Sequence, residues 1–371
     1  MLEALFVVQL DDYHGFIVKK RYPSSLSLNE KVLNLVFFAH QQDKKGGIQL
    51  SEIEGMNIAS YSQSNYPGWI ICYVIESNDL SPEEKEFIPG MGRLILELMS
   101  ENPDEVDIEE ILKRKSTLPE QNEEQRAASV FLTPSSSLIL ERMQTQGVDS
   151  AAKLSLWLKN QIQSDDVNIR DAIKPLILSG IVKVEMISKT KETVFLLKDI
   201  FNYRAPPVVS LQKSEELYPE MMGQYRSYVT TFFSPPPPNK GYNPTIPDDD
   251  PNSPLLEDRE NIARVIAKSL HYTVLQCVRD HPMSLSEIAQ KTALPETITQ
   301  SSLWALETNR VVAYFEEEDV WGLITNPIIE TFMPEYSLQL VSRKLVDKEI
   351  SSEIGSRYLE LLIEVWSDSS D

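Results

Sequence analysis

Residues 6–23, FVVQLDDYHGFIVKKRYP, decide the fold of the first hundred residues. Two apolar, partly alternating runs flank turn chemistry at Asp11–Gly15, a pattern that predicts a β-hairpin of Leu2–Leu10 with Phe16–Tyr22. Glu3 precedes the first run and no basic segment does, so we expect a buried strand and not a signal peptide. The chain therefore opens with two paired strands.

Further strands and two helices are predicted on either side of this hairpin. Apolar spacing indicates a helix over Leu28–Gln41, and Ser81-Pro82 followed by two acids begins another that runs towards Met99. We expect Pro89 and Gly90 to disturb that second helix. The strands between them are predicted at Ile48–Ile53, Met56–Gln63 and the continuously apolar Gly68–Glu76. The order β-β-α-β-β-β-α over residues 1–100 predicts an antiparallel sheet flanked by helices, and an α+β fold class.

Residues 101–126 hold nine acids against four bases and little apolar content. We expect an acidic, solvated connection with a short helix around Val106–Lys113.

Residues 127–201 combine three helical patterns with two short β runs. The helices are predicted at Ser135–Gln146, Ala151–Gln161 and Asp165–Ser179, and the strands at Ile181–Ile187 and Thr193–Leu197. Three helices followed by a hairpin is the order of a winged-helix module.

Residues 202–257 are rich in proline and aspartate, with Pro235–Pro238 and Asp248–Asp250 as the densest runs. Such a composition cannot bury a core and predicts an extended linker. Its middle, Ser214–Phe233, is different because it is rich in tyrosine, phenylalanine and methionine. We expect that segment to dock on a neighbour.

Residues 258–330 repeat the order of the first module. We predict one long helix over Glu260–Arg279, a short one over Ser284–Lys291, a third over Leu294–Asn309, and wing strands at Arg310–Phe315 and Val320–Ile324. The likeness to residues 127–201 is one of architecture, without a convincing internal sequence repeat. Residues 331–371 are predicted to be a helical tail, with an amphipathic helix over Ser351–Trp366.

No motif in the sequence assembles a catalytic or metal site. The two cysteines, Cys72 and Cys277, lie in apolar runs and predict buried free thiols, and no Cys/His cluster indicates zinc. The four histidines are scattered over different elements. Gly90-Met91-Gly92-Arg93 lacks the rest of a phosphate loop, so we interpret it as a kinked or interrupted helix. We expect no enzyme activity and no cofactor.

Charge decides against nucleic acid as the default partner. The net charge is −21, and the second wing turn, Glu316–Asp319, places four acids where phosphates would lie. Only the first wing offers positive charge, which makes Lys183, Lys189 and Lys191 the candidate nucleic-acid contacts. Protein contact is the favoured interpretation, in an acidic cytoplasmic protein without a transmembrane segment that reaches membranes only through its partners.

Residues 6–23 resemble the start of longin domains, and specifically those of the nitrogen permease regulator 2-like family. In that family too a helix follows, then strands that lead to a Tyr-Ser loop, here Tyr61-Ser62-Gln63-Ser64-Asn65, and then an apolar strand and a closing helix. The family also continues into winged-helix modules. The resemblance covers residues 1–100 in pattern and the rest of the chain in architecture.

The resemblance implies a complex that acts on a Rag-type small GTPase. Eukaryotic members use an arginine in the Tyr-Ser loop as an arginine finger, which neutralises charge on the transferring phosphoryl group. The aligned residue here is the uncharged Gln63, and the domain's other arginines, Arg21 and Arg93, lie outside the loop. The resemblance therefore implies GTPase binding, through Tyr61–Asn65 and Arg21, without arginine-finger activity.

Three function classes follow from these predictions. The leading hypothesis is a non-catalytic scaffold or regulator that binds a small Ras- or Rag-like GTPase through the longin-like domain and other subunits through the winged helices. The second is a membrane-trafficking adaptor built on tandem winged helices, as in ESCRT-II subunits. The third is a DNA-binding regulator that uses the first winged helix.

Overall fold

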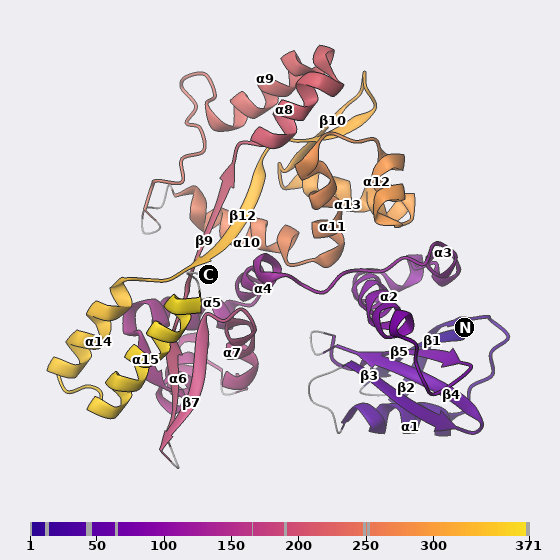
Figure 1. Cartoon of the computed structure of the whole chain (residues 1–371), viewed down its shortest axis with the longest axis horizontal. Helices are drawn as coiled ribbons and strands as arrows, with labels where there is room; N and C mark the ends of the chain where they lie inside the picture. Colours follow the sequence, from indigo (N-terminus) through magenta and orange to yellow (C-terminus); the bar gives the residue numbers. More distant parts are fainter. Residues whose placement is uncertain are drawn as a thin grey trace.

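The computed structural model describes residues 2–11, 15–41, 47–63, 66–164, 166–188, 191–247, 250 and 253–368. Figure 1 shows a mixed α+β molecule in three parts: an N-terminal sheet domain (residues 2–101), a first module (123–205) and a second module (254–332). In the part of the chain so described, no helix is both long and apolar enough to cross a bilayer.

The sheet domain is built on five strands in the order β2-β1-β5-β4-β3, with every neighbouring pair antiparallel. Their bounds are β1 (Leu2–Asp11), β2 (Gly15–Tyr22), β3 (Gly47–Ile53), β4 (Met56–Ser62) and β5 (Trp69–Ile75). The predicted antiparallel sheet with flanking helices is confirmed. His14, in the predicted hairpin turn, lies outside the described residues.

One helix covers each face of this sheet. Alternate residues of β1 point to opposite sides, so Phe6 packs with α1 (Glu30–Gln41) whereas Leu5 packs with α2 (Pro82–Glu101). The central strand β5 is buried on both faces, as its continuous apolar run predicts.

Helix α2 runs without interruption through Pro89, so the predicted interruption at Gly90 is wrong. A capping box at Ser81 and Glu84 starts the helix. The glycines serve close packing instead: a Cβ at Gly92 would lie 2.4 Å from the Tyr61 ring, and one at Gly90 would lie 2.9 Å from Thr117.

The acidic connection is packed and not solvated, which corrects the prediction. It forms η1 (Pro103–Glu105) and α3 (Ile108–Arg114), and its few apolar side chains, Val106, Ile111 and Leu118, are buried in the main core. Acids such as Asp104, Asp107 and Glu109 are exposed on this segment, while its sparse apolar residues are buried.

The first module contains the three predicted helices and a hairpin in the predicted order, preceded by a further short helix over residues 123–129. Its elements are α4 (Glu123–Ser129), η2 (Val130–Leu132), α5 (Pro134–Gln146), β6 (Val148–Ser150), α6 (Ala151–Ile162), α7 (Ile169–Leu178), β7 (Val182–Ser188), β8 (Lys191–Leu196) and β9 (Asp199–Ala205). Strands β6, β8 and β7 form one sheet. The predicted third helix is shorter than expected, and β9 crosses the predicted boundary at residue 201 into the predicted linker.

The second module has the same order: α10 (Pro254–Ile266), α11 (Ser269–Asp280), α12 (Leu285–Thr292), α13 (Glu296–Thr308), β10 (Val312–Phe315), β11 (Val320–Leu323) and β12 (Asn326–Phe332). The single helix predicted over residues 260–279 is wrong. It breaks into α10 and α11 at Lys268, which has an extended backbone. The carboxyl group of Glu97 in the sheet domain accepts the Leu270 amide in the first turn of α11.

A two-stranded ribbon of β9 and β12 joins the two modules, centred on the pair Asn202–Ile329 (Figure 1). A helical pair follows each of these strands. After β9 come α8 (Val208–Leu217), η3 (Pro219–Met221) and α9 (Met222–Phe233), and after β12 come α14 (Tyr336–Val346) and α15 (Ser352–Asp368). The tail thus holds two helices where one amphipathic helix was located from sequence.

Each helical pair packs on the opposite module. Met222 and Tyr225 of α9 are buried against Phe315 of the second wing, which confirms the docked aromatic segment. Tyr358 of α15 is buried against Phe195 in the first module.

Candidate functional site

The Tyr-Ser loop begins at the end of β4 and lies against α2. The side chain of Tyr61 is buried, and its ring rests directly on Gly92. Burial raises the pKa of the Tyr61 phenol, while the neighbouring Arg93 opposes that shift. Tyr61 therefore anchors the loop and is not available as a contact for a partner.

Ser62 and Ser60 hold the side chain of His40 between them. The His40 Nε2 lies 2.8 Å from the Ser60 hydroxyl and its Nδ1 lies 2.9 Å from the Ser62 hydroxyl. Since Ser60 donates its own hydrogen to the Gln49 carbonyl, His40 donates from Nε2 and accepts from Ser62 at Nδ1. This network fastens the end of α1 to β4.

Gln63 is half-buried, and its carbonyl accepts the amide of Tyr66 at 3.0 Å, which closes a turn over the end of the sheet. Ser64 and Asn65, the other two residues of the predicted partner-binding loop, lie outside the described residues.

Arg93, which the sequence places apart from the loop, packs beside Tyr61. Its side chain is only 12% exposed, its Nε donates to the Leu118 carbonyl at 3.0 Å, and its Nη1 lies 3.9 Å from a Glu120 carboxylate. These contacts hold the Arg93 guanidinium inside the sheet domain, where it is not free to reach a partner. The paired glycines before Arg93 were the available signal, because they mark close packing around this turn of the helix.

Arg21 does not approach the loop. In the sheet register Arg21 of β2 pairs with Phe6, Phe6 pairs with Cys72, and Cys72 pairs with Ser60 of β4. Arg21 is therefore three strand spacings, about 14 Å in total, from the strand that leads into the loop. Its Nη1 donates to the Leu26 carbonyl at 3.1 Å. No arginine is therefore positioned in the described part of the loop to act as a finger.

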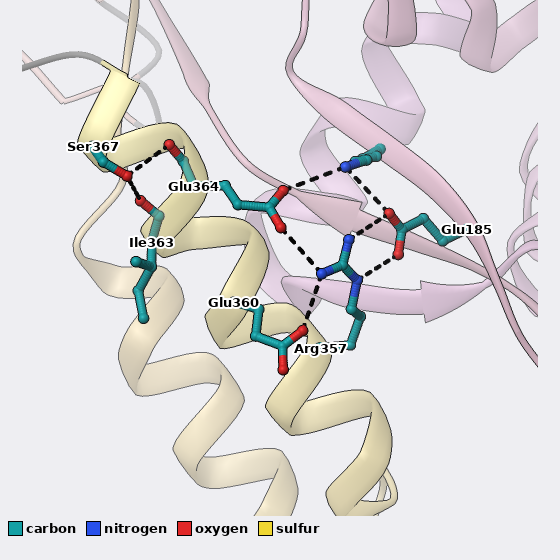
Figure 2. A network of polar contacts seen from close by, with 7 residues as sticks. Glu185, Arg357, Glu360, Ile363, Glu364 and Ser367 are labelled. Carbon is teal, nitrogen blue, oxygen red and sulfur yellow. Dashed lines mark hydrogen bonds and ion pairs between the residues drawn. The ribbon is translucent and has the colours of Figure 1, made fainter. Parts of the chain in front are cut away.

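Acidic side chains surround the candidate basic wing of the first module. Lys183 lies 3.2 Å from Glu185 and 3.6 Å from Glu364. Figure 2 shows Arg357 of α15 bonded to Glu185 on β7 and to Glu360 and Glu364 on its own helix. Hydrogen bonding to Arg357 lowers the pKa of Glu185 to about 2.

The other candidate lysines of this wing are Lys191 and Lys189. Lys191 is exposed at the start of β8, and Lys189 lies outside the described residues. Lys198, just after the wing, pairs with Glu123.

Large apolar side chains, in contrast, are exposed on the third helix of each module. Trp304 of α13 is 54% exposed, and Leu178 of α7 is also 54% exposed. The wing turn beside α13 carries Glu316 and Glu317 in exposed positions. A helix with an exposed tryptophan and an acidic wing suits a protein surface better than a phosphate backbone.

The described residues hold no group of three or more His, Cys, Asp or Glu side chains that could bind a metal ion. Cys72 and Cys277 are free and buried, and burial raises the pKa of both thiols. Such thiols stay protonated near neutral pH and are poor nucleophiles.

No protein family model, curated protein or solved structure gives a significant match to this chain. Function is therefore inferred from the surfaces described above.

Proposed function

We propose that this chain is a non-catalytic scaffold that binds a small Ras- or Rag-like GTPase through its sheet domain and other protein subunits through its two modules. The observation that carries the proposal is the outer face of α1. Leu35 and Phe38 lie three residues apart on that face and are 43% and 57% exposed, while Val32 and Val36 fill the core beneath.

The order of strands and helices in the sheet domain supports the longin-like assignment, and folds of this kind commonly serve as platforms for small GTPases. That step is an analogy between folds. On this molecule, the exposed face of α1 is the surface that we propose for GTPase binding.

The helix and strand order of the two modules supports the winged-helix assignment. Their exposed surfaces favour protein partners, because Trp304 and Leu178 are exposed on the third helices and Lys183 of the first wing is already paired. DNA binding through the first wing would bring phosphates close to Glu185 and Glu364, which repel them.

Neither arginine of the sheet domain lies in the Tyr-Ser loop. Gln63 is uncharged, Arg93 donates to the Leu118 carbonyl, and Arg21 lies in the edge strand β2, three strands away from the loop's strand. We therefore expect binding without acceleration of GTP hydrolysis.

The test uses the full chain, because the sheet domain is packed against the second module and a deletion would expose that contact. Purified chain is tested for binding to a panel of Ras-like GTPases, loaded with GDP or a non-hydrolysable GTP analogue. Phe38→Asp should weaken the observed binding at least tenfold, since it places a charge in an apolar contact. Leu50→Asp is the matched control, since Leu50 is also an exposed apolar residue, at 43%, but points to the α2 side of the sheet.

Retention of no GTPase in either nucleotide state would refute the proposal, as would equal effects of the two substitutions. A loss of subunits on Trp304→Ala without any bound GTPase would support the adaptor hypothesis. A salt-dependent shift of duplex DNA that Lys183→Ala reduces would support the DNA-binding hypothesis.

A further inference from the structure

A buried carboxyl group of the sheet domain bonds to the backbone of the second module. Glu97 lies on α2, is only 5% exposed, and accepts the backbone amide of Leu270 at 2.9 Å. Leu270 belongs to the first turn of α11, whose amides have no partner within the helix. Lys268, which precedes the helix, supplies no side-chain cap of its own. The cap of α11 is therefore provided by another domain.

The surrounding interface consists of apolar contacts with a few polar ones. Lys268 pairs with Glu101, the Gln121 side chain donates to the Ala267 carbonyl at 3.0 Å, and Ser116 donates to the Ala293 carbonyl. Met99 of α2 and Leu270 belong to the same continuous core. At the Leu270 end of this interface, Glu97 is the carboxyl buried away from solvent.

We propose that Glu97 is a proton-linked latch, so that the sheet domain docks on the second module more tightly when this carboxyl is protonated than when it is charged. The device goes beyond the scaffold function and does not rest on it. It requires only that burial of Glu97 depends on docking, which the Leu270 hydrogen bond across the interface indicates.

The direction of the pH dependence of docking follows from the pKa of the carboxyl group in the docked and undocked states. Burial raises the pKa of Glu97 from 4.5 to about 7 in the docked state, although the Leu270 amide opposes that shift. When α2 separates from α11 the carboxyl meets water, and its pKa returns towards 4.5. Docking therefore takes up a proton. The docking constant should fall roughly tenfold per pH unit between pH 4.5 and 7 and stay constant above pH 7.

Three other titratable or charged groups interact with Glu97, and a fourth, His271, follows its partner Leu270 in α11. Glu101 and Lys268 form their own ion pair, and burial raises the pKa of Tyr66 far above neutral pH. His271, on α11, has its pKa lowered by burial to about 4, so undocking that exposed it would favour its protonation below pH 6.5. That effect opposes the effect of Glu97, and the experiment must separate the two.

Glu97→Gln separates them, because an amide can accept the Leu270 hydrogen bond but carries no charge at any pH. Hydrogen exchange of the Leu270 amide reports opening of this interface. Position 97 is far from Leu270 in the chain, so the chemical exchange rate and the His271 contribution cancel in the ratio of wild-type to variant rates at each pH. We expect that ratio to rise about tenfold per pH unit from pH 5 to pH 7 and then to level off.

Glu86→Gln is the matched control, since Glu86 is exposed on the same helix and its replacement is the same change of a carboxyl group to an amide. Its exchange rates should equal those of wild type. A ratio for Glu97→Gln that does not change between pH 5 and 8 would overturn the latch.

A titration of the wild-type chain guards against a misfolded variant. The carboxyl carbon of Glu97, observed by nuclear magnetic resonance with labelled glutamate, should titrate with a midpoint near 7. A midpoint near 4.5 would equally overturn the proposal.

Discussion

In the first module the Ile181 amide donates to the Leu176 carbonyl at 3.0 Å, and in the second the Val311 amide donates to the Leu306 carbonyl at 2.9 Å. The correspondence continues after the wings. The Leu197 amide donates to Ile181 at 2.7 Å, and the Ile324 amide donates to Val311 at 2.8 Å. The two modules thus share the backbone connections between third helix and wing.

The helical pairs repeat this relationship across the ribbon. The Tyr225 hydroxyl of α9 donates to the Leu323 carbonyl, and the Tyr358 hydroxyl of α15 donates to the Leu196 carbonyl, both at 2.8 Å. Each module therefore has its wing completed by the helices that follow the other module. The two modules and their helical pairs form one interlocked unit.

The side chains on this shared backbone differ. Phe195 and Gly322 occupy the same place, one residue before Leu196 and Leu323. Phe195 packs on Tyr358 of α15, whereas Gly322 leaves room for the ring of Phe315 from its own module. The two modules therefore share their backbone hydrogen bonds and their exchanged helical pairs more than their side chains. Substitutions at equivalent positions should show which contributions to stability the two modules share and which belong to one module alone.

The largest difference is expected at Arg204 in β9. Its guanidinium is buried, bonds both carboxylate oxygens of Asp258 and donates to the Asn309 carbonyl. The equivalent position in β12, two residues past the central pair, is the half-exposed Thr331. Arg204→Ala should cost about 3–5 kcal/mol of unfolding free energy because it leaves Asp258 charged and unpaired, whereas Thr331→Ala should cost under about 0.5 kcal/mol. Urea denaturation measures both.

A double-mutant cycle sharpens the result. If the unpaired carboxylate causes the loss, Arg204→Ala with Asp258→Ala together should be more stable than Arg204→Ala alone. A double variant that is less stable would instead assign the loss to the bonds that Arg204 makes to the second module.

Arg204 also shows why part of the fold could not be predicted from sequence. The run Asp199–Ala205 places polar Asn202 and Arg204 at buried positions, so it lacks the apolar alternation of a strand. Its partner β12 begins more than a hundred residues later. The sheet domain was predictable because its strands pair mostly with near neighbours and alternate as expected.

The candidate site was predictable to a smaller extent. The sequence located the Tyr61–Gln63 loop, but only tertiary packing places Tyr61 beneath the surface and Arg93 beside it. The exposed face of α1 could have been inferred from sequence, since Leu35 and Phe38 widen the apolar stripe beyond one face.

A smaller and nearly symmetrical effect is expected for the two tyrosine hydroxyls. Tyr225→Phe and Tyr358→Phe each remove one buried hydrogen bond and leave a carbonyl unsatisfied, so each should cost about 1–1.5 kcal/mol. Tyr225 also lies 3.0 Å from the Ser210 hydroxyl, which places it at the upper end. Unfolding measurements on both variants make the comparison.

The control is Tyr228→Phe, because Tyr228 is partly exposed on the same helix as Tyr225 and should lose little. If one of the two buried hydroxyls proved neutral while the other cost the full amount, the exchanged helical pairs would not be equivalent in energy.

The smallest effect concerns the turn between third helix and wing, where Gly180 and Arg310 occupy the same place before Ile181 and Val311. Both have left-handed backbones, with φ of 71° and 56°. Gly180→Ala meets no atom within 4 Å of its new Cβ, so its cost of about 1 kcal/mol is that of the backbone alone. Arg310→Gly should be stabilising by about 0.5–1 kcal/mol, because the exposed arginine already bears this cost. Opposite signs in urea denaturation would show that the shared backbone imposes the same conformation on both modules, whereas a loss in both variants would mean that the Arg310 side chain compensates through contacts of its own.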